Sequence, residues 1–160
     1  MLLYNRWANL TLLEACRSLT DVQLNASPAG VSGSIGELLT HLVGSQQTFV
    51  LRTKGRQHEG ELGRETAWPG IETLIEIATS TSDELVVIAE AFDDREVVLP
   101  YIDTHYSFPL RFFLTHTIEH GAEHRTEVKV GLLQLGIETP DLDGWRWAAA
   151  MGYGQEVDAP

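Results

Sequence analysis

The sequence predicts an all-α fold, a four-helix bundle with one short extra helix at the C-terminus, and two observations carry this prediction. Four long stretches repeat apolar residues at the three- and four-residue spacing of an amphipathic helix. Strand signals are few, since only the short run at residues 97–99 is typical of a strand. Long amphipathic helices with so little strand favour a helix bundle over a sheet-based fold.

The first two helices are expected in the N-terminal third of the chain. Apolar residues at helical spacing predict a helix over residues 2–19. Residues 20–33 are rich in turn formers and predict a connection. A second helix is expected over residues 34–53, because Ser34 and Glu37 fit a capping box, in which each side chain bonds the other's backbone N–H.

The third and fourth helices are separated from their neighbours by irregular segments. Residues 54–70 combine charge with glycine and predict an exposed loop, with or without a short strand. A third helix is expected from residue 71 to about residue 92. The next segment is extended or irregular, and a fourth helix is expected over residues 109–135, with Gly136 as its left-handed stop.

A fifth, shorter helix is expected to begin at Thr139 and Pro140, with threonine as the cap and proline in the first turn. It carries Trp145 and Trp147, which stand two positions apart and so cannot both face one core. Because tryptophan is enriched at protein interfaces, this arrangement predicts a homodimer.

Composition narrows the classes of protein. The 160 residues suit a single domain over residues 1–160, and the net charge of −12 argues against nucleic acid and anionic membrane surfaces as partners. No apolar run approaches the ~20 residues that span a bilayer. The single cysteine, Cys16, permits no internal disulfide and is interpreted as a packing residue, which suits a cytoplasmic protein.

Three histidines, His116, His120 and His124, follow one another at a spacing of four in the fourth helix. On a helical wheel they share a stripe about 80° wide with Glu127, and this stripe borders the apolar face. The three span roughly 12 Å along the axis, whereas ligand nitrogens must lie within ~2.1 Å of one zinc-like ion. One straight helix therefore supplies two ligands at most, and the more inward pair, His120 and His124, is favoured.

A third ligand must come from elsewhere, and His41 borders the apolar face of the second helix. Two helices that pack through these faces would bring the three side chains together. A lone histidine on a helix is usually a surface or hydrogen-bonded residue, so spacing leaves metal binding and a structural role both open. His58 and His105 are expected in exposed loops.

Three stretches resemble the DinB/YfiT-like family: "YNRWANLTLLEA" near the start, "ELLTHLVGSQQ", and "HGAEHRTEVKVGLLQLG" in the fourth helix. The resemblance implies a dimeric four-helix bundle that holds a divalent metal with three histidines. It assigns the ligands to His41, His120 and His124 and gives His116 no ligand role. Where the family commonly has HRGQ, this chain has "HRTE", so Glu127 stands in place of glutamine. Two roles stay open for this carboxylate: it orients a ligand histidine by accepting its other ring N–H, or it is a salt-bridge partner.

Imidazole ligands without a placed cysteine favour zinc or nickel. Three histidines leave a coordination position open, which is typical of a catalytic site. The resemblance implies either transfer of a low-molecular-weight thiol to a small-molecule substrate or metal-dependent hydrolysis. A dimeric metal-binding or stress-response bundle without catalysis is the remaining alternative. Nothing in the sequence selects the thiol or the substrate.

Overall fold

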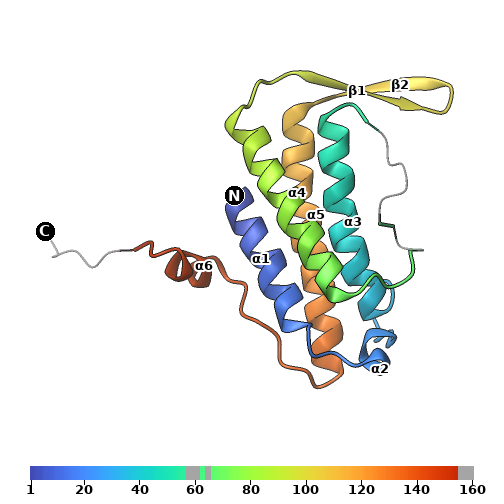
Figure 1. The fold of residues 1–160 in the computed structure, drawn as a ribbon, viewed down its shortest axis with the longest axis vertical. Helices are drawn as coiled ribbons and strands as arrows, with labels where there is room; N and C mark the ends of the chain where they lie inside the picture. The colour runs from blue at the N-terminus through green and yellow to red at the C-terminus, as the bar shows by residue number, and fades with distance from the viewer. Residues whose placement is uncertain (57–61, 64–65, 155–160) are drawn as a thin grey trace, which may run out of the picture.

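The computed structural model describes residues 1–56, 62–63 and 66–154 of the chain. Four long helices lie side by side in Figure 1: α1 (Leu2–Ala15), α3 (Ile35–Thr53), α4 (Ile71–Glu90) and α5 (Leu110–Gln134). Two short helices, α2 (Asp21–Leu24) and α6 (Gly144–Ala150), and a hairpin of β1 (Glu96–Tyr101) and β2 (Thr104–Pro109) complete the described elements. The fold is therefore mostly helical. The expectation of an all-α bundle with one extra helix missed α2 and the hairpin.

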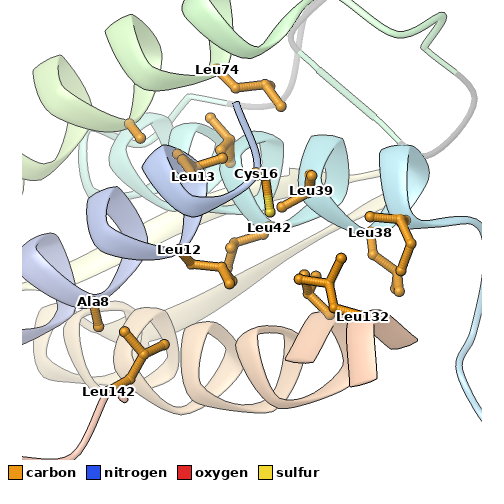
Figure 2. Close-up of a cluster of buried hydrophobic side chains, with 14 residues drawn as sticks. Ala8, Leu12, Leu13, Cys16, Leu38, Leu39, Leu42, Leu74, Leu132 and Leu142 are labelled. Carbon is orange, nitrogen blue, oxygen red and sulfur yellow. The ribbon is translucent and has the colours of Figure 1, made fainter. Parts of the chain in front are cut away.

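One apolar core holds the long helices together. Figure 2 shows leucines of α1, α3, α4 and α5 pointing into the space between these helices. The innermost side chains are fully or almost fully buried and include Leu12, Leu13, Leu38, Leu39, Leu42, Leu74 and Leu132. Burying each leucine contributes about 1.5–3 kcal/mol relative to leaving it in water, so this cluster is the main stabilising feature of the helix packing.

Helix boundaries follow local capping, and most lie close to the predicted ones. The Ser34–Glu37 capping box is formed at the start of α3, and α3 ends at Thr53 as expected. At the end of α5, Gly136 has a φ of 72°, and the N–H groups of Gly136 and Ile137 bond the carbonyls of Leu133 and Leu132. This is the Schellman arrangement, which satisfies the last carbonyls of the helix.

Two predicted helix boundaries were wrong. The first helix ends at Ala15 rather than residue 19, and the predicted connection contains α2 instead. A second capping box, between Thr20 and Gln23, starts α2. The last helix begins at Gly144, because the Asp143 carboxylate accepts the N–H of Trp145 at 2.7 Å and so caps the helix later than Thr139 would.

The hairpin is the element that differs most from the prediction. Residues 97–99 do form a strand, but β1 and β2 pair in antiparallel register from Glu96↔Pro109 to Tyr101↔Thr104. Ile102 in the two-residue turn has a φ of 44°, an uncommon conformation for a β-branched residue. The two turn residues also lack the usual Asn-Gly or Asp-Gly signal. The hairpin is therefore not predicted by the sequence.

The hairpin lies across the end of the molecule where α3 ends and α5 begins (Figure 1). Val97, Leu99 and Phe108 of the hairpin pack with Phe49 of α3 and Phe113 of α5 in a second, smaller apolar cluster. This contact fixes the hairpin beside the histidine-bearing stretch of α5. No helix in the described part of the chain is long and apolar enough to cross a membrane.

Candidate metal centre

His41, His120 and His124 come together between α3 and α5. One ligand nitrogen from each lies within 4.8 Å of the other two. The ring centroid of His41 lies 5.2 Å from that of His120 and 4.6 Å from that of His124. The centroids of His120 and His124 are 4.3 Å apart. Two of the side chains come from the i, i+4 pair on α5, and α3 supplies the third, which is the arrangement the helical wheels predicted.

The spacing of these nitrogens suits a single ion. Nitrogens at ~2.1 Å around a tetrahedral ion stand about 3.4 Å apart. The ligand nitrogens of the three histidines lie within 4.8 Å of one another, which is somewhat more than this separation. Small side-chain rotations would bring them to the separation that an ion requires. The chemistry of the set also fits, because three imidazoles without a thiolate are typical ligands for zinc, nickel and copper.

Glu127 engages His124 directly. Its Oε2 lies 2.6 Å from His124 Nδ1, and its Oε1 accepts the Ser32 backbone N–H at 3.2 Å. Partial burial raises the pKa of the Glu127 carboxyl, but hydrogen bonds from Ser32 and His124 outweigh burial and bring that pKa below its ordinary value. The carboxylate is therefore ionised at neutral pH, and it turns the Nε2 of His124 into the nitrogen available to a ligand.

A buried polar network holds α5 in this orientation. Arg125 is 3% exposed and donates from Nη1 to the side-chain oxygens of Asn5 and Asn9 at 2.7 and 2.6 Å. The side-chain amides of these asparagines donate to Gln46 Oε1. The Gln46 amide in turn donates to three oxygen atoms on α4. Burial lowers the pKa of Arg125 from its very high ordinary value. The network joins all four long helices immediately next to His124.

Sequence reasoning missed this network. Its members are polar residues on faces that pack inward, and none of them stands out by spacing. Gly121 is the one local signal, because a Cβ at this position would lie 2.7 Å from Asn5 Oδ1 and 2.8 Å from Arg125 Nη1. A residue without a side chain is therefore required between His120 and the network.

The histidine group opens onto a pocket of about 450 Å³. His41 and His120 line one side of it, and the remaining lining residues are Ser45, Thr48, Phe49, Arg52, Leu62, Gly63 and His116. His124 is 5% exposed and lies deeper. His116 stands outside the group, with its ring 5.6 Å from that of His120 and 4.7 Å from Phe49.

The remaining titratable candidates lie elsewhere. His105 is exposed as expected, but it lies in β2 rather than in a loop, and His58 falls outside the described residues. Cys16 is buried in the main core, where burial raises the pKa of its thiol to about 12. This cysteine is therefore a packing residue and takes no part in the histidine group.

Two helices of a mostly helical fold bring three histidines together beside an open pocket. The fold and the site therefore place the protein among helical proteins with a candidate metal centre. The chain belongs to the DinB family, whose model matches residues 1–156. The structure is similar to that of a DinB-like protein from Bacillus cereus, with 20% identity, a TM-score of 0.64, and coverage of 87% of this chain and 91% of the other.

A DinB-like protein from Bacillus subtilis is similar as well, with 21% identity, a TM-score of 0.59, and coverage of 89% and 94% of the two chains. At these identities the likeness concerns the fold. No curated protein matches the chain closely enough to count as a relative.

Proposed function

We propose that the chain is a metal-dependent enzyme in which His41, His120 and His124 hold one divalent transition ion, zinc or nickel. The observation that carries this proposal is the convergence of three ligand nitrogens within 4.8 Å of one another. The contact between Glu127 and His124 supports it, because a carboxylate that accepts the second ring N–H is the usual partner of a metal-binding histidine.

The open pocket favours a catalytic site over a structural one. Structural zinc sites are closed by four protein ligands, whereas catalytic sites keep a position for an exogenous ligand. In the described part of the chain the group offers three ligands, and two of them line a pocket of about 450 Å³. A small molecule that enters this pocket would reach the histidine group.

The reaction proposed first is transfer of a low-molecular-weight thiol to an electrophilic carbon. When bound, the ion lowers the pKa of a coordinated thiol and so supplies a thiolate near neutral pH. The sulfur forms a bond to the carbon, a leaving group such as chloride departs with its bonding electrons, and the thiol proton passes to solvent. The chain's own residues hold the ion, orient His124 and line the pocket in which the two substrates meet.

Hydrolysis is the second candidate, and it requires a general base near the attacking water. Glu127 is poorly suited to this role, because its two oxygens are engaged with His124 and with the Ser32 backbone. His116 is the better candidate, since its imidazole lines the same pocket without belonging to the three-histidine group. Thiol transfer makes no such demand and is therefore preferred.

Metal content tests the site. Purified wild type is expected to carry about one ion per chain, His120→Ala to lose it, and His116→Ala to keep it, because His116 stands outside the ligand group. Elemental analysis of the three proteins gives the answer. Equal metal in wild type and His120→Ala would overturn the assignment.

Conjugation of a chlorinated nitroaromatic compound with a panel of thiols tests the reaction. Release of chloride and formation of the thioether should occur with wild type, stop with a chelator, and be absent in His120→Ala. A rate that the chelator leaves unchanged would reject a metal-dependent transfer. No rate above background with any thiol would direct attention to hydrolysis or to a non-catalytic bundle.

A further inference from the structure

A second pocket, of about 560 Å³, lies where the hairpin meets the first turns of α5. This volume is in the range of small-molecule sites. Its walls are mainly aromatic and apolar and consist of Leu99, Pro100, Tyr101, Tyr106, Phe108, Phe112 and Phe113, with Arg52 and His116 as the polar members. Flat aromatic rings are the groups that such walls bind best, through stacked and edge-to-face contacts.

The aromatic pocket adjoins the pocket of the histidine site. Arg52 and His116 line both pockets. A row of rings runs along the same path, because Phe108 stacks on Phe112 at 5.2 Å and Phe112 contacts His116 at 5.4 Å between ring centroids. His116 in turn stands 5.6 Å from His120. A molecule held in the aromatic pocket therefore lies next to the candidate metal centre.

Arg52 gives this region its positive charge. Its guanidinium lies 5.8 Å from the Phe49 ring centroid, and the side chain is half-buried. Two other cations at this end of the molecule are paired with carboxylates, Lys54 with Glu84 and Arg111 with Asp94. No carboxylate among the described residues lies within ion-pair distance of Arg52, and the residues that line the aromatic pocket include none.

We propose that the aromatic pocket binds a small aromatic anion, with its ring against Tyr106 and Phe112 and its anionic group on Arg52. A chain with a net charge of −12 repels anions in general, so an arginine that pairs with no carboxylate in the described part of the chain supplies a local exception between the two pockets. If the aromatic anion is the electrophilic substrate, this role of the pocket rests on the proposed function. Binding of the anion itself does not require a metal.

Calorimetry with a matched pair of probes tests the proposal on the full-length protein, both metal-loaded and chelator-treated. Naphthalenesulfonate carries the charge, and methyl naphthyl sulfone has nearly the same shape without it. Wild type should bind the sulfonate about tenfold more tightly than the sulfone, because an anion on a partly buried arginine gains a charge-assisted hydrogen bond. Equal affinity for the two probes would overturn the proposal.

Three variants assign the effect to residues. Arg52→Gln should lose the preference for the sulfonate and keep the affinity for the sulfone. Phe112→Ala should weaken both probes about equally, and circular dichroism should show an intact fold because Phe112 is 41% exposed. Arg111→Gln, the control, changes the net charge by the same amount near the pocket but should keep the preference, since Asp94 already pairs with Arg111.

The outcomes separate this proposal from the proposed function. A preference that survives in Arg52→Gln, or that disappears equally in Arg111→Gln, would reject Arg52 as the anion site. A metal-free wild type that still discriminates between the probes supports the pocket even if elemental analysis finds no bound ion. Conversely, metal binding at the histidines stands if neither probe binds.

Discussion

The Nδ1 of His124 lies 2.6 Å from the Oε2 of Glu127, one turn further along α5. This contact ties the most deeply buried histidine of the group to a carboxylate that also accepts the N–H of Ser32. The imidazole is thereby held in one orientation, and its second nitrogen is kept available on the side of His41 and His120. We expect the contact to control how tightly the site holds an ion.

Glu127→Gln should weaken metal affinity about 10- to 100-fold, because the amide still reaches His124 but carries no negative charge to strengthen the imidazole as a ligand. Competition with a chromogenic chelator measures the affinity. Glu123→Gln is the matched control, since Glu123 is exposed on the same helix and lies outside the histidine group. Wild-type affinity in Glu127→Gln would show that the negative charge at this position has no part in metal binding.

Gly121→Ala should destabilise the fold by about 1–3 kcal/mol, because the new Cβ would collide with Asn5 and Arg125 in the buried network. Alanine is otherwise favoured over glycine in a helix by about 1 kcal/mol, so the sign of the change tests the packing. Gly144→Ala meets no atom within 4 Å and should be neutral or slightly stabilising. Urea unfolding of both variants decides, and a Gly121→Ala protein as stable as wild type would contradict the description of the network.

Cys16 should make the fold less stable at high pH. Its thiol ordinarily has a pKa of 9.0, and burial raises the pKa to about 12 in the folded state. Between these values the unfolded chain loses the proton and the folded chain keeps it, so the free energy of unfolding falls as pH rises. From about pH 8 to about pH 10 this loss is about 1.4 kcal/mol.

Cys16→Ala lacks this titration, so the difference between wild type and the variant isolates it from other groups that titrate in the same range. Urea unfolding at both pH values provides the four free energies. The variant should lose about 1.4 kcal/mol less than wild type over this interval. An identical pH dependence in the two proteins would mean that the thiol is not held protonated by burial.

The homodimer stays a prediction, and α6 offers a way to test it. Trp147 packs against Tyr4 with 5.9 Å between ring centroids, whereas Trp145 is 85% exposed. Light scattering at micromolar concentration should give about twice the chain mass of 17.8 kDa. Trp145→Ala should shift the protein toward monomer, while Val22→Ala, which removes a similarly exposed apolar side chain from α2, should not. A monomeric wild type would refute the prediction.

Features that depend on one or two helical turns could be read from the sequence. The capping box of Ser34 and Glu37 and the left-handed Gly136 are local, because their partners lie within a few residues. The spacing of His120 and His124 is local in the same sense, since i, i+4 places both imidazoles on one side of a helix. The position of His41 at the edge of an apolar face also indicated its partner helix, because such faces pack together.

Features that join distant parts of the chain were decided by the tertiary structure. The hairpin forms because β1 and β2 pair across a turn with no turn signal, and its apolar side packs on Phe49 and Phe113. Arg125 is buried because asparagines more than 100 residues away accept its hydrogen bonds. The place of Arg52 between two pockets likewise depends on where α3, α5 and the hairpin meet. Sequence spacing carries no information on such contacts, because their free energy arises only when separate elements exclude water from the same space.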